Sequence, residues 1–395
     1  MSLFSPASKV EAIPFAGIRR VFEKAEQLAA QGVKVIHFEI GRPDFDTPEN
    51  IKQAAVEALH KGFVHYTPNV GILPLRKTLA EIILRDKNVS YDPEKEIMVT
   101  AGGQQALFLT FTSLLNEGDE VLVPDPGYGQ YTSGARLAGA VPLPVPLIEG
   151  HNSMMDLAYA QDLVSPRTRM IVLNSPHNPT GGVLTRGQIE EVCDFAQKHG
   201  LIIVSDEAYD RILYEGEAHI SPASLDGMDK ITVMCGSLSK TYAMTGWRIG
   251  YIAAPPELIA ASIKVQQNVL LSICSFAQFG ALEALRGSQE SVRNMVGEFD
   301  KRRQVILEGI EKCPGLESPV APMGAFYFFV RFNVPEFTSV QMCDYLLDNA
   351  AVAVVPGNTF GANGEGYLRI SFATSYEDCC EGMERINSAM RKLLG

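Results

Sequence analysis

Between about residues 96 and 255, the sequence alternates between short apolar segments and segments with helical spacing. The apolar segments are typical of buried strands, in the order EIMVTAG, EVLVPDP, AVPLPVPL, RMIVLNSP, LIIVSDEA, KITVMCG and RIGYIAAP. One intervening stretch, TRGQIEEVCDFAQKHG, repeats its apolar residues at the spacing of a helix face. This alternation predicts an α/β domain built on a mostly parallel sheet.

Beyond about residue 285 the pattern changes to a long polar helix, VRNMVGEFDKRRQVILEGIEKC, followed by the shorter strands AFYFFVRF and GYLRISFA. A chain of 395 residues exceeds the size at which one core usually keeps growing, so two domains are expected. We predict a large domain of residues 46–284 and a smaller α+β domain formed by residues 1–45 and 285–395.

Composition excludes several classes of partner. The formal net charge of -12 argues against nucleic acid and against a membrane surface, because both favour a basic face. Seven cysteines are scattered without a CxxC pair, so neither a metal site nor a disulfide framework is expected. The chain opens with no signal-like segment and holds no apolar run long enough to span a bilayer, which favours the cytoplasm.

Unusual residues collect where the predicted strands end. The clusters are TAGGQQAL, DPGYGQY, NSPHNPTGG, SDEAYD and GSLSK. Ligands of open α/β sheets bind outside the carboxyl ends of the strands, so these clusters predict one shared site.

Lys240 lies in the last of these clusters, on a loop between two predicted strands. Most lysines are solvated surface charges. Small and hydroxyl residues nearby, with Arg248 eight positions later, also suit a phosphate pocket. The residues themselves leave two functional interpretations open, a phosphate ligand and a Schiff-base nucleophile.

Two further clusters have a structural and a functional interpretation. Gly102, Gly103 and Gln104 stand at a strand-to-helix turn, where free backbone N–H groups and the helix dipole receive an anion, although two glycines also simply permit a tight turn. Asp206 follows four apolar residues, so its charge needs a partner. A helix cap would supply one, and so would a protonated ring nitrogen that Tyr209 also reaches.

Three more side chains are ambiguous in the same way. Asn178 sits in a proline-stiffened loop and is either a turn former or a fixed polar ligand, and the Asn178–Pro179 bond is a candidate cis peptide. Tyr128 offers an aromatic face. Arg369 lies within an apolar strand, where it either reaches the surface or grips a carboxylate with both nitrogens.

Together these motifs resemble the class I aminotransferases, the fold type I enzymes of pyridoxal 5'-phosphate (PLP), and especially the bacterial aspartate aminotransferase-like group. The resemblance covers nearly the whole chain. Its motifs, in the family's order, are IGRPDFDTP, HYTPNVGILPLR, TAGGQQAL, DPGYGQY, NSPHNPTGG, SDEAYDRILY, SLSKTYAMTGWRIGY, GAFYFF, VAVVPG and LRISFA. It implies a large domain with a mostly parallel seven-stranded sheet.

The resemblance assigns the residues around the PLP ring. Lys240 would bond covalently to the cofactor, and Asp206 would pair with the pyridine nitrogen. Asn178 and Tyr209 would bind the phenolic oxygen, and Tyr128 would stack on the ring. An apolar pocket beside arginines lowers a lysine pKa, which favours the nucleophile over the phosphate ligand.

The resemblance also implies the phosphate and substrate contacts. The phosphate would be held by Gly102, Gly103, Gln104, Ser237, Ser239 and Arg248. Tyr66 would reach the phosphate of a neighbouring subunit, which implies a homodimer with shared sites. Arg369 would clamp the substrate α-carboxylate, with Gly41 and Asn178 nearby.

The implied activity is ping-pong transfer of an amino group between an amino acid and a 2-oxo acid through PLP and its amine form. Aspartate enzymes of this group often carry lysine where this chain has Gln104, so the preferred substrate stays open. Two other uses of the scaffold stay open as well, a PLP-dependent C–S β-lyase and a PLP-binding regulatory domain.

Overall fold

A computed structural model describes residues 4–13 and 17–395, so residues 1–3 and 14–16 of the predicted small domain lie outside the described residues. Its centre is a seven-stranded sheet in the order β2-β8-β7-β6-β5-β3-β4. In chain order the strands are β2 (Ile97–Thr100), β3 (Glu120–Asp125), β4 (Val141–Pro146), β5 (Thr168–Asn174), β6 (Ile202–Asp206), β7 (Thr232–Ser237) and β8 (Gly250–Ala253). Strand β8 runs antiparallel to both neighbours and the other pairs along β7 to β4 are parallel, which confirms the predicted mostly parallel sheet.

Both faces of this sheet are covered, which explains why its strands are apolar throughout rather than alternating. Within β5, for example, Met170 and Val172 join one core cluster, whereas Ile171 and Leu173 join the cluster on the opposite face. One face packs on α5 (Gly103–Leu114), α6 (Gln130–Leu137) and α9 (Pro256–Val269). The other packs on α4 (Leu73–Lys87), α7 (Leu157–Leu163), α8 (Arg186–His199) and α10 (Ser275–Arg286), with α3 (Glu49–His60) beside α10.

Helix α8 shows how local sequence sets these elements. Thr185 caps its N-terminus by accepting from the backbone N–H of Gln188, whose side chain returns a bond to Thr185. Gly200 ends the helix with φ of 64°, a left-handed conformation that favours glycine. The apolar residues predicted to share one face are buried against the sheet.

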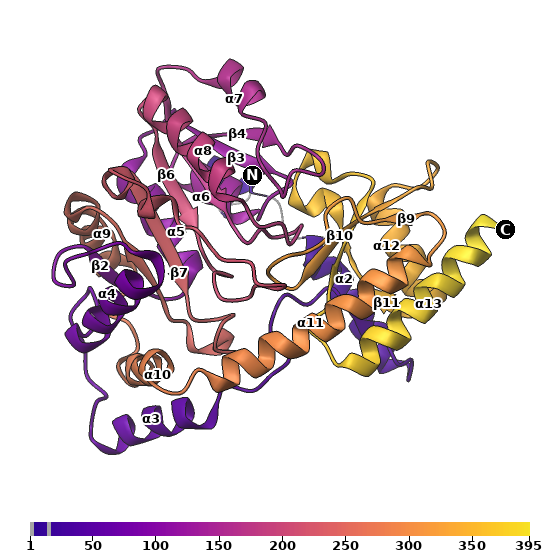
Figure 1. Ribbon diagram of the computed structural model, residues 1–395, viewed down its shortest axis with the longest axis horizontal. Helices are drawn as coiled ribbons and strands as arrows, with labels where there is room; N and C mark the ends of the chain where they lie inside the picture. The colour runs from indigo at the N-terminus through magenta and orange to yellow at the C-terminus, as the bar shows by residue number, and fades with distance from the viewer. Residues whose placement is uncertain (1–3, 14–16) are drawn as a thin grey trace.

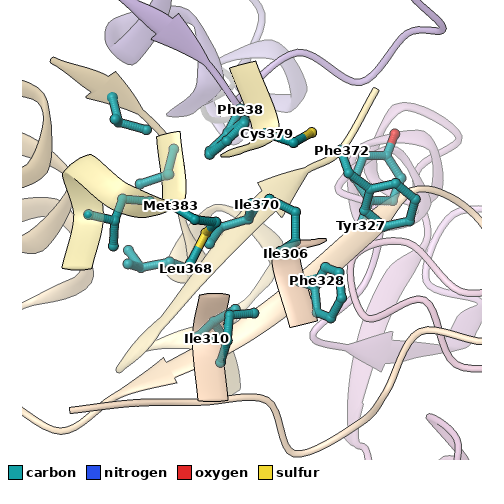
Figure 2. Packing of buried hydrophobic residues seen from close by; sticks show 14 of the residues in the cluster. Phe38, Ile306, Ile310, Tyr327, Phe328, Leu368, Ile370, Phe372, Cys379 and Met383 are labelled. Atoms are coloured by element: carbon teal, nitrogen blue, oxygen red, sulfur yellow. The ribbon is translucent and has the colours of Figure 1, made fainter. Parts of the chain in front are cut away.

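A second sheet forms beside the first, in the order β12-β13-β10-β9 with antiparallel pairing. Its strands are β9 (Leu316–Glu317), β10 (Tyr327–Phe332), β12 (Val355–Pro356) and β13 (Tyr367–Ser371). It is accompanied by α2 (Gly17–Ala30), α11 (Glu290–Glu311), α12 (Ser339–Ala350) and α13 (Tyr376–Leu394). Figure 2 shows its core, in which Phe38, Ile306, Phe328, Ile370 and Met383 pack together.

The N-terminal segment from α2 onward joins this second unit. Strand β1 (Ile36–His37) pairs in parallel with β11 (Val352–Ala353), so residues more than 300 positions apart lie side by side. The short helix α1 (Ser8–Glu11) instead lies against α6 of the large domain, where Arg136 donates a hydrogen bond of 3.0 Å to the backbone oxygen of Ala12. The domain limits at residues 45 and 284 stay a prediction, and the second falls within the last turn of α10.

Candidate active site

A cavity of about 730 Å³ lies at the carboxyl edge of the large sheet and is closed on one side by the second unit. Strands β5, β6 and β7 supply Asn174, Asp206 and Ser237, while Gly41 and Arg369 come from the second unit. Of the predicted site residues, the lining includes Gly41, Gly103, Gln104, Tyr128, Asn178, Asp206, Tyr209, Ser237, Ser239, Lys240, Arg248 and Arg369. Parallel strands therefore bring together residues that are far apart in sequence, as their positions at strand ends predict.

Lys240 follows β7, and its Nζ donates a hydrogen bond of 2.5 Å to the backbone oxygen of Gly41. Burial lowers the pKa of this amine to about 8, and the positive charges of Arg369 and Arg248 add to the effect. An amine with this pKa is partly deprotonated at neutral pH, which a nucleophile or a general base requires.

Asp206 ends β6 and is only 7% exposed. Its Oδ2 accepts a 2.8 Å bond from the hydroxyl of Tyr131, and its Oδ1 accepts from the backbone N–H of Ala208. Burial raises the pKa of the carboxyl to about 6 despite these two bonds. A cationic N–H in the cavity would favour the charged form of Asp206 and be stabilised by it.

Asn178 and Tyr209 occupy one wall of the cavity. The Oδ1 of Asn178 accepts a bond of 3.2 Å from Arg369, and its backbone N–H donates to Asn174 Oδ1. The Asn178–Pro179 bond is cis, as predicted. The hydroxyl of Tyr209 lies 2.9 Å from the hydroxyl of Tyr327.

The turn before α5 forms a cradle for an anion. Gly102 has φ of 82°, and a Cβ there would lie 2.6 Å from Nη2 of Arg248, so only glycine admits the arginine. Gly102 does not line the cavity, whereas Gly103 begins the helix and faces it together with Ser237 and Arg248. Helix N-terminal N–H groups beside an exposed guanidinium suit a phosphate.

Arg369 is buried on β13. Its Nη2 donates to the backbone oxygen of Glu39 at 2.8 Å, and its guanidinium lies 4.3 Å from the ring centroid of Tyr327. Its Nε has no hydrogen-bond partner among the described residues. A buried cation with a free donor at a cavity wall suits a carboxylate.

Tyr66, unlike most of the other predicted site residues, lies outside the cavity. Its side chain is 83% exposed and does not line the cavity. The prediction that it serves a second subunit is not tested by the single chain.

The comparisons with known proteins agree with this arrangement. The family model described as aminotransferase class I and II matches residues 33–386. The chain is 41% identical to an aspartate aminotransferase of Pyrococcus abyssi over 95% of each chain, and 39% identical to aromatic-amino-acid aminotransferase 2 of Thermococcus litoralis over 98% of each. A solved aspartate aminotransferase of Thermus thermophilus with maleate superposes with a TM-score of 0.91 at 38% identity, covering 98% of this chain and all of that chain. This protein is a class I and II aminotransferase.

Membership of the aminotransferase family implies PLP as the cofactor, and the cavity fits that group. Asp206 is a buried carboxylate suited to a ring N–H. Because Gly102 has no side chain, Arg248 lies close to the N-terminus of α5, where both can bind a phosphate. The amine of Lys240, whose pKa is lowered, lines the same cavity. The donor set therefore matches each charged end of PLP.

The aminotransferase site also contains residues that the sequence analysis missed. Tyr131, Asn174 and Tyr327 line the cavity and bind Asp206, Asn178 and Tyr209 respectively. Tyr131 belongs to the DPGYGQY cluster and follows Tyr128 by three residues. This spacing, about one helical turn, could have indicated that both tyrosines face the same site.

Neither a metal site nor a membrane-spanning helix is found in the described part of the aminotransferase. Within residues 4–13 and 17–395, no group of three or more His, Cys, Asp or Glu is placed to hold a metal ion. Over the same residues, no helix combines the length and apolar character needed to cross a membrane.

Proposed function

We propose that this aminotransferase binds PLP at Lys240 and exchanges the amino group of an amino acid with a 2-oxo acid by a ping-pong route. The observation that carries the proposal is the common cavity: the Lys240 amine, the buried Asp206 carboxyl and the buried Arg369 guanidinium all face it. Transfer of an amino group between an amino acid and the cofactor needs a reactive amine, an acid that pairs with the cofactor ring and a cation that binds the substrate carboxylate.

PLP, when bound, accepts the amino group and spreads the electron pair that remains when the substrate α-proton is removed. Lys240 would serve as the base that takes this proton from the substrate α-carbon and passes it to the cofactor carbon that carries the amino group, because its amine is partly deprotonated near neutral pH. The Asp206 carboxylate, which accepts a hydrogen bond from Tyr131, would hold a proton on the ring nitrogen. Asn178 and Tyr209, which line the same cavity, would bind the phenolic oxygen of the ring, and Tyr128 would stack on it.

The phosphate is held by the α5 N-terminus. Its N–H groups and the helix dipole attract a dianion, while Arg248 adds a fixed cation. The backbone oxygens of Thr245 and Ala101 accept from Arg248 and hold its guanidinium in place. Gln104, Ser237 and Ser239 complete the proposed contacts.

Arg369 binds the α-carboxylate of the substrate, with Gly41 and Asn178 beside it. Its Nη1 and Nη2 are fixed by Asn178 and by the backbone of Glu39, so the fork is already oriented before a carboxylate arrives. The relatives include aspartate and aromatic-amino-acid aminotransferases, and Gln104 supplies no positive charge for a second carboxylate. We therefore leave the substrate side chain open between these two classes.

We propose further that the active form is a homodimer. Apolar side chains near Tyr66 are exposed in the single chain, and Phe63 contacts Phe279 on α10. The exposed set comprises Val56, Leu59, Phe63, Val64, Val269, Leu270 and Leu271. They belong to two segments that a hydrogen bond from Gln266 to the backbone oxygen of Asn69 brings near each other, and exposed apolar side chains of this kind are typical of a subunit interface. Sedimentation analysis tests this, and a monomer at micromolar concentration would reject it.

The experiment that tests the function is a half-reaction screen. Purified protein should show the visible absorbance of bound PLP, and each of the twenty amino acids is added without an acceptor. The preferred substrates bleach this band and release a 2-oxo acid in equal amount. Release of pyruvate and ammonia through many turnovers without an acceptor would instead identify a C–S β-lyase.

A further inference from the structure

A cluster of charged side chains is buried behind the active-site cavity. Lys87, the last residue of α4, has a side chain that is only 6% exposed. Its Nζ lies 2.6 Å from Oε2 of Glu207 and 2.7 Å from Oδ2 of Asp210. Burial opposes a charge on Lys87, but Asp210 and Glu207 raise its pKa well above the ordinary value.

Glu207 is held from several directions. Its Oε1 accepts hydrogen bonds from the hydroxyls of Ser205 at 2.9 Å and Ser221 at 2.6 Å, and its Oε2 lies 3.1 Å from Nε2 of His219. Burial alone would raise the pKa of Glu207, but Lys87 and His219 hold it well below the usual range. The acid and the lysine are therefore both charged in the interior.

Along the short turn of residues 206–210, the residues that contact Lys87 alternate with the proposed catalytic residues. Asp206 and Tyr209 line the cavity, whereas Glu207 and Asp210 bond to Lys87 behind it. A second cavity of about 30 Å³ is lined by Lys87 and Asp210 together with Ser237 and Thr241, so the cluster also borders the loop that carries Lys240.

A buried ion cluster is a poor source of net stability, because desolvation offsets most of the attraction between the charges. An apolar side chain in place of Lys87 would lose the fixed positions of the charged groups. We propose that Lys87 is a positioning residue that holds the 206–210 turn through Glu207 and Asp210, and so fixes Asp206 and Tyr209 toward the cofactor. This inference rests on the roles proposed above for Asp206 and Tyr209.

Removing the Lys87 ammonium leaves two carboxylates in a region of low dielectric, where they repel each other and lose their common partner. The turn between them then relaxes. A displacement of about 1 Å at a catalytic group costs on the order of 100-fold in rate. The cofactor contacts of Asp206 and Tyr209 weaken together, although neither residue is changed.

The test compares Lys87→Met with Arg303→Met in the full-length protein. Arg303 is also buried and ion-paired, with Asp300 at 2.8 Å, but it lies on α11 and does not line the cavity. Each apoprotein is titrated with PLP at a temperature where circular dichroism shows it folded. Lys87→Met should raise the PLP dissociation constant tenfold or more, while Arg303→Met leaves it within twofold of the wild type. Equal effects in the two variants would overturn the inference.

A second readout does not depend on the fraction of active protein. The pH midpoint of the visible absorbance change of the PLP-loaded enzyme should move to higher pH in Lys87→Met, because unneutralised Glu207 adds negative potential near Asp206. An unchanged midpoint counts against the proposal. The charged or titratable groups that face the cluster and the site also include Asp86, Tyr91, Tyr128, Tyr131, Asp210, Arg211, His219, Cys235, Lys240, Tyr242, Arg248, Tyr251 and Arg369.

If Lys87→Met does not fold, Glu207→Gln becomes the deciding variant, because it keeps the size of the side chain and an acceptor for the two serines. It should weaken PLP binding by threefold or more, and an unchanged dissociation constant would overturn the proposal. A wild type that binds no PLP would refute the proposed function itself. Wild-type binding with an unaffected variant refutes only the role of Lys87.

Discussion

The guanidinium of Arg369 donates a hydrogen bond of 3.2 Å to Oδ1 of Asn178, although the two residues are 191 positions apart. Arg369 belongs to the second sheet, and Asn178 to the loop that follows β5 of the large sheet. The bond joins the proposed carboxylate clamp to a proposed cofactor ligand. A substrate carboxylate and the PLP ring would thus be positioned by one connected pair.

Arg369→Lys should lower kcat/KM for the preferred amino acid by about 100-fold, mainly through KM. Lysine keeps the charge but loses the two-pronged geometry, and disrupting a buried charged pair costs about 2–5 kcal/mol. Steady-state kinetics measure the change. Arg331→Lys, on the neighbouring strand β10 and partly exposed, is the matched control and should behave as the wild type. An unaltered KM in Arg369→Lys would exclude the clamp.

Lys240→Ala should reduce turnover by about 1,000-fold or more, because general base catalysis alone contributes on the order of 100- to 10,000-fold. Lys264→Ala, at an exposed position of α9, is the control and should keep full activity. The measurement is the rate of the complete transamination at saturating substrate. Substantial turnover in Lys240→Ala would reject the role of this amine.

The rate at which the apoprotein incorporates PLP should rise with pH, with a midpoint near 8. Burial and the charges of Arg369 and Arg248 lower the pKa of Lys240 to about 8, so the reactive neutral amine predominates above that pH. Arg369→Gln removes one of these cations and should move the midpoint upward, whereas Arg369→Lys should not. Stopped-flow absorbance measures the rates. A rate that is flat or falls between pH 6 and 9 would contradict the assignment.

Tyr131→Phe should weaken PLP binding by about tenfold, because a hydrogen bond to a charged group contributes roughly 1.5–3 kcal/mol. The bond from Tyr131 lowers the pKa of Asp206, so its loss raises that pKa above about 6 and disfavours the carboxylate that pairs with the ring nitrogen. Titration of the apoprotein measures the affinity. The same affinity in both proteins would show that Tyr131 does not support Asp206.

The fold and most of the site were predictable from the sequence because their signals are local. Continuous apolar strands mark a sheet covered on both faces, and Asp206, Asn178 and Lys240 stand just where strands end. Resemblance to the aminotransferases then gave those residues their roles.

Pairings between distant side chains were not predictable in this way. Tyr131 meets Asp206 across 75 positions and Tyr209 meets Tyr327 across 118, and no local pattern specifies such partners. Lys87 is a similar case. It stands among charged residues near a helix end, where a lysine is normally solvated, and only the tertiary structure shows its burial.

The most direct test is to reduce the PLP-loaded protein with borohydride, digest it and locate the labelled peptide by mass spectrometry. The account predicts one pyridoxyl group per chain, attached to Lys240. A label on any other lysine, or a protein that takes up no label, would contradict it.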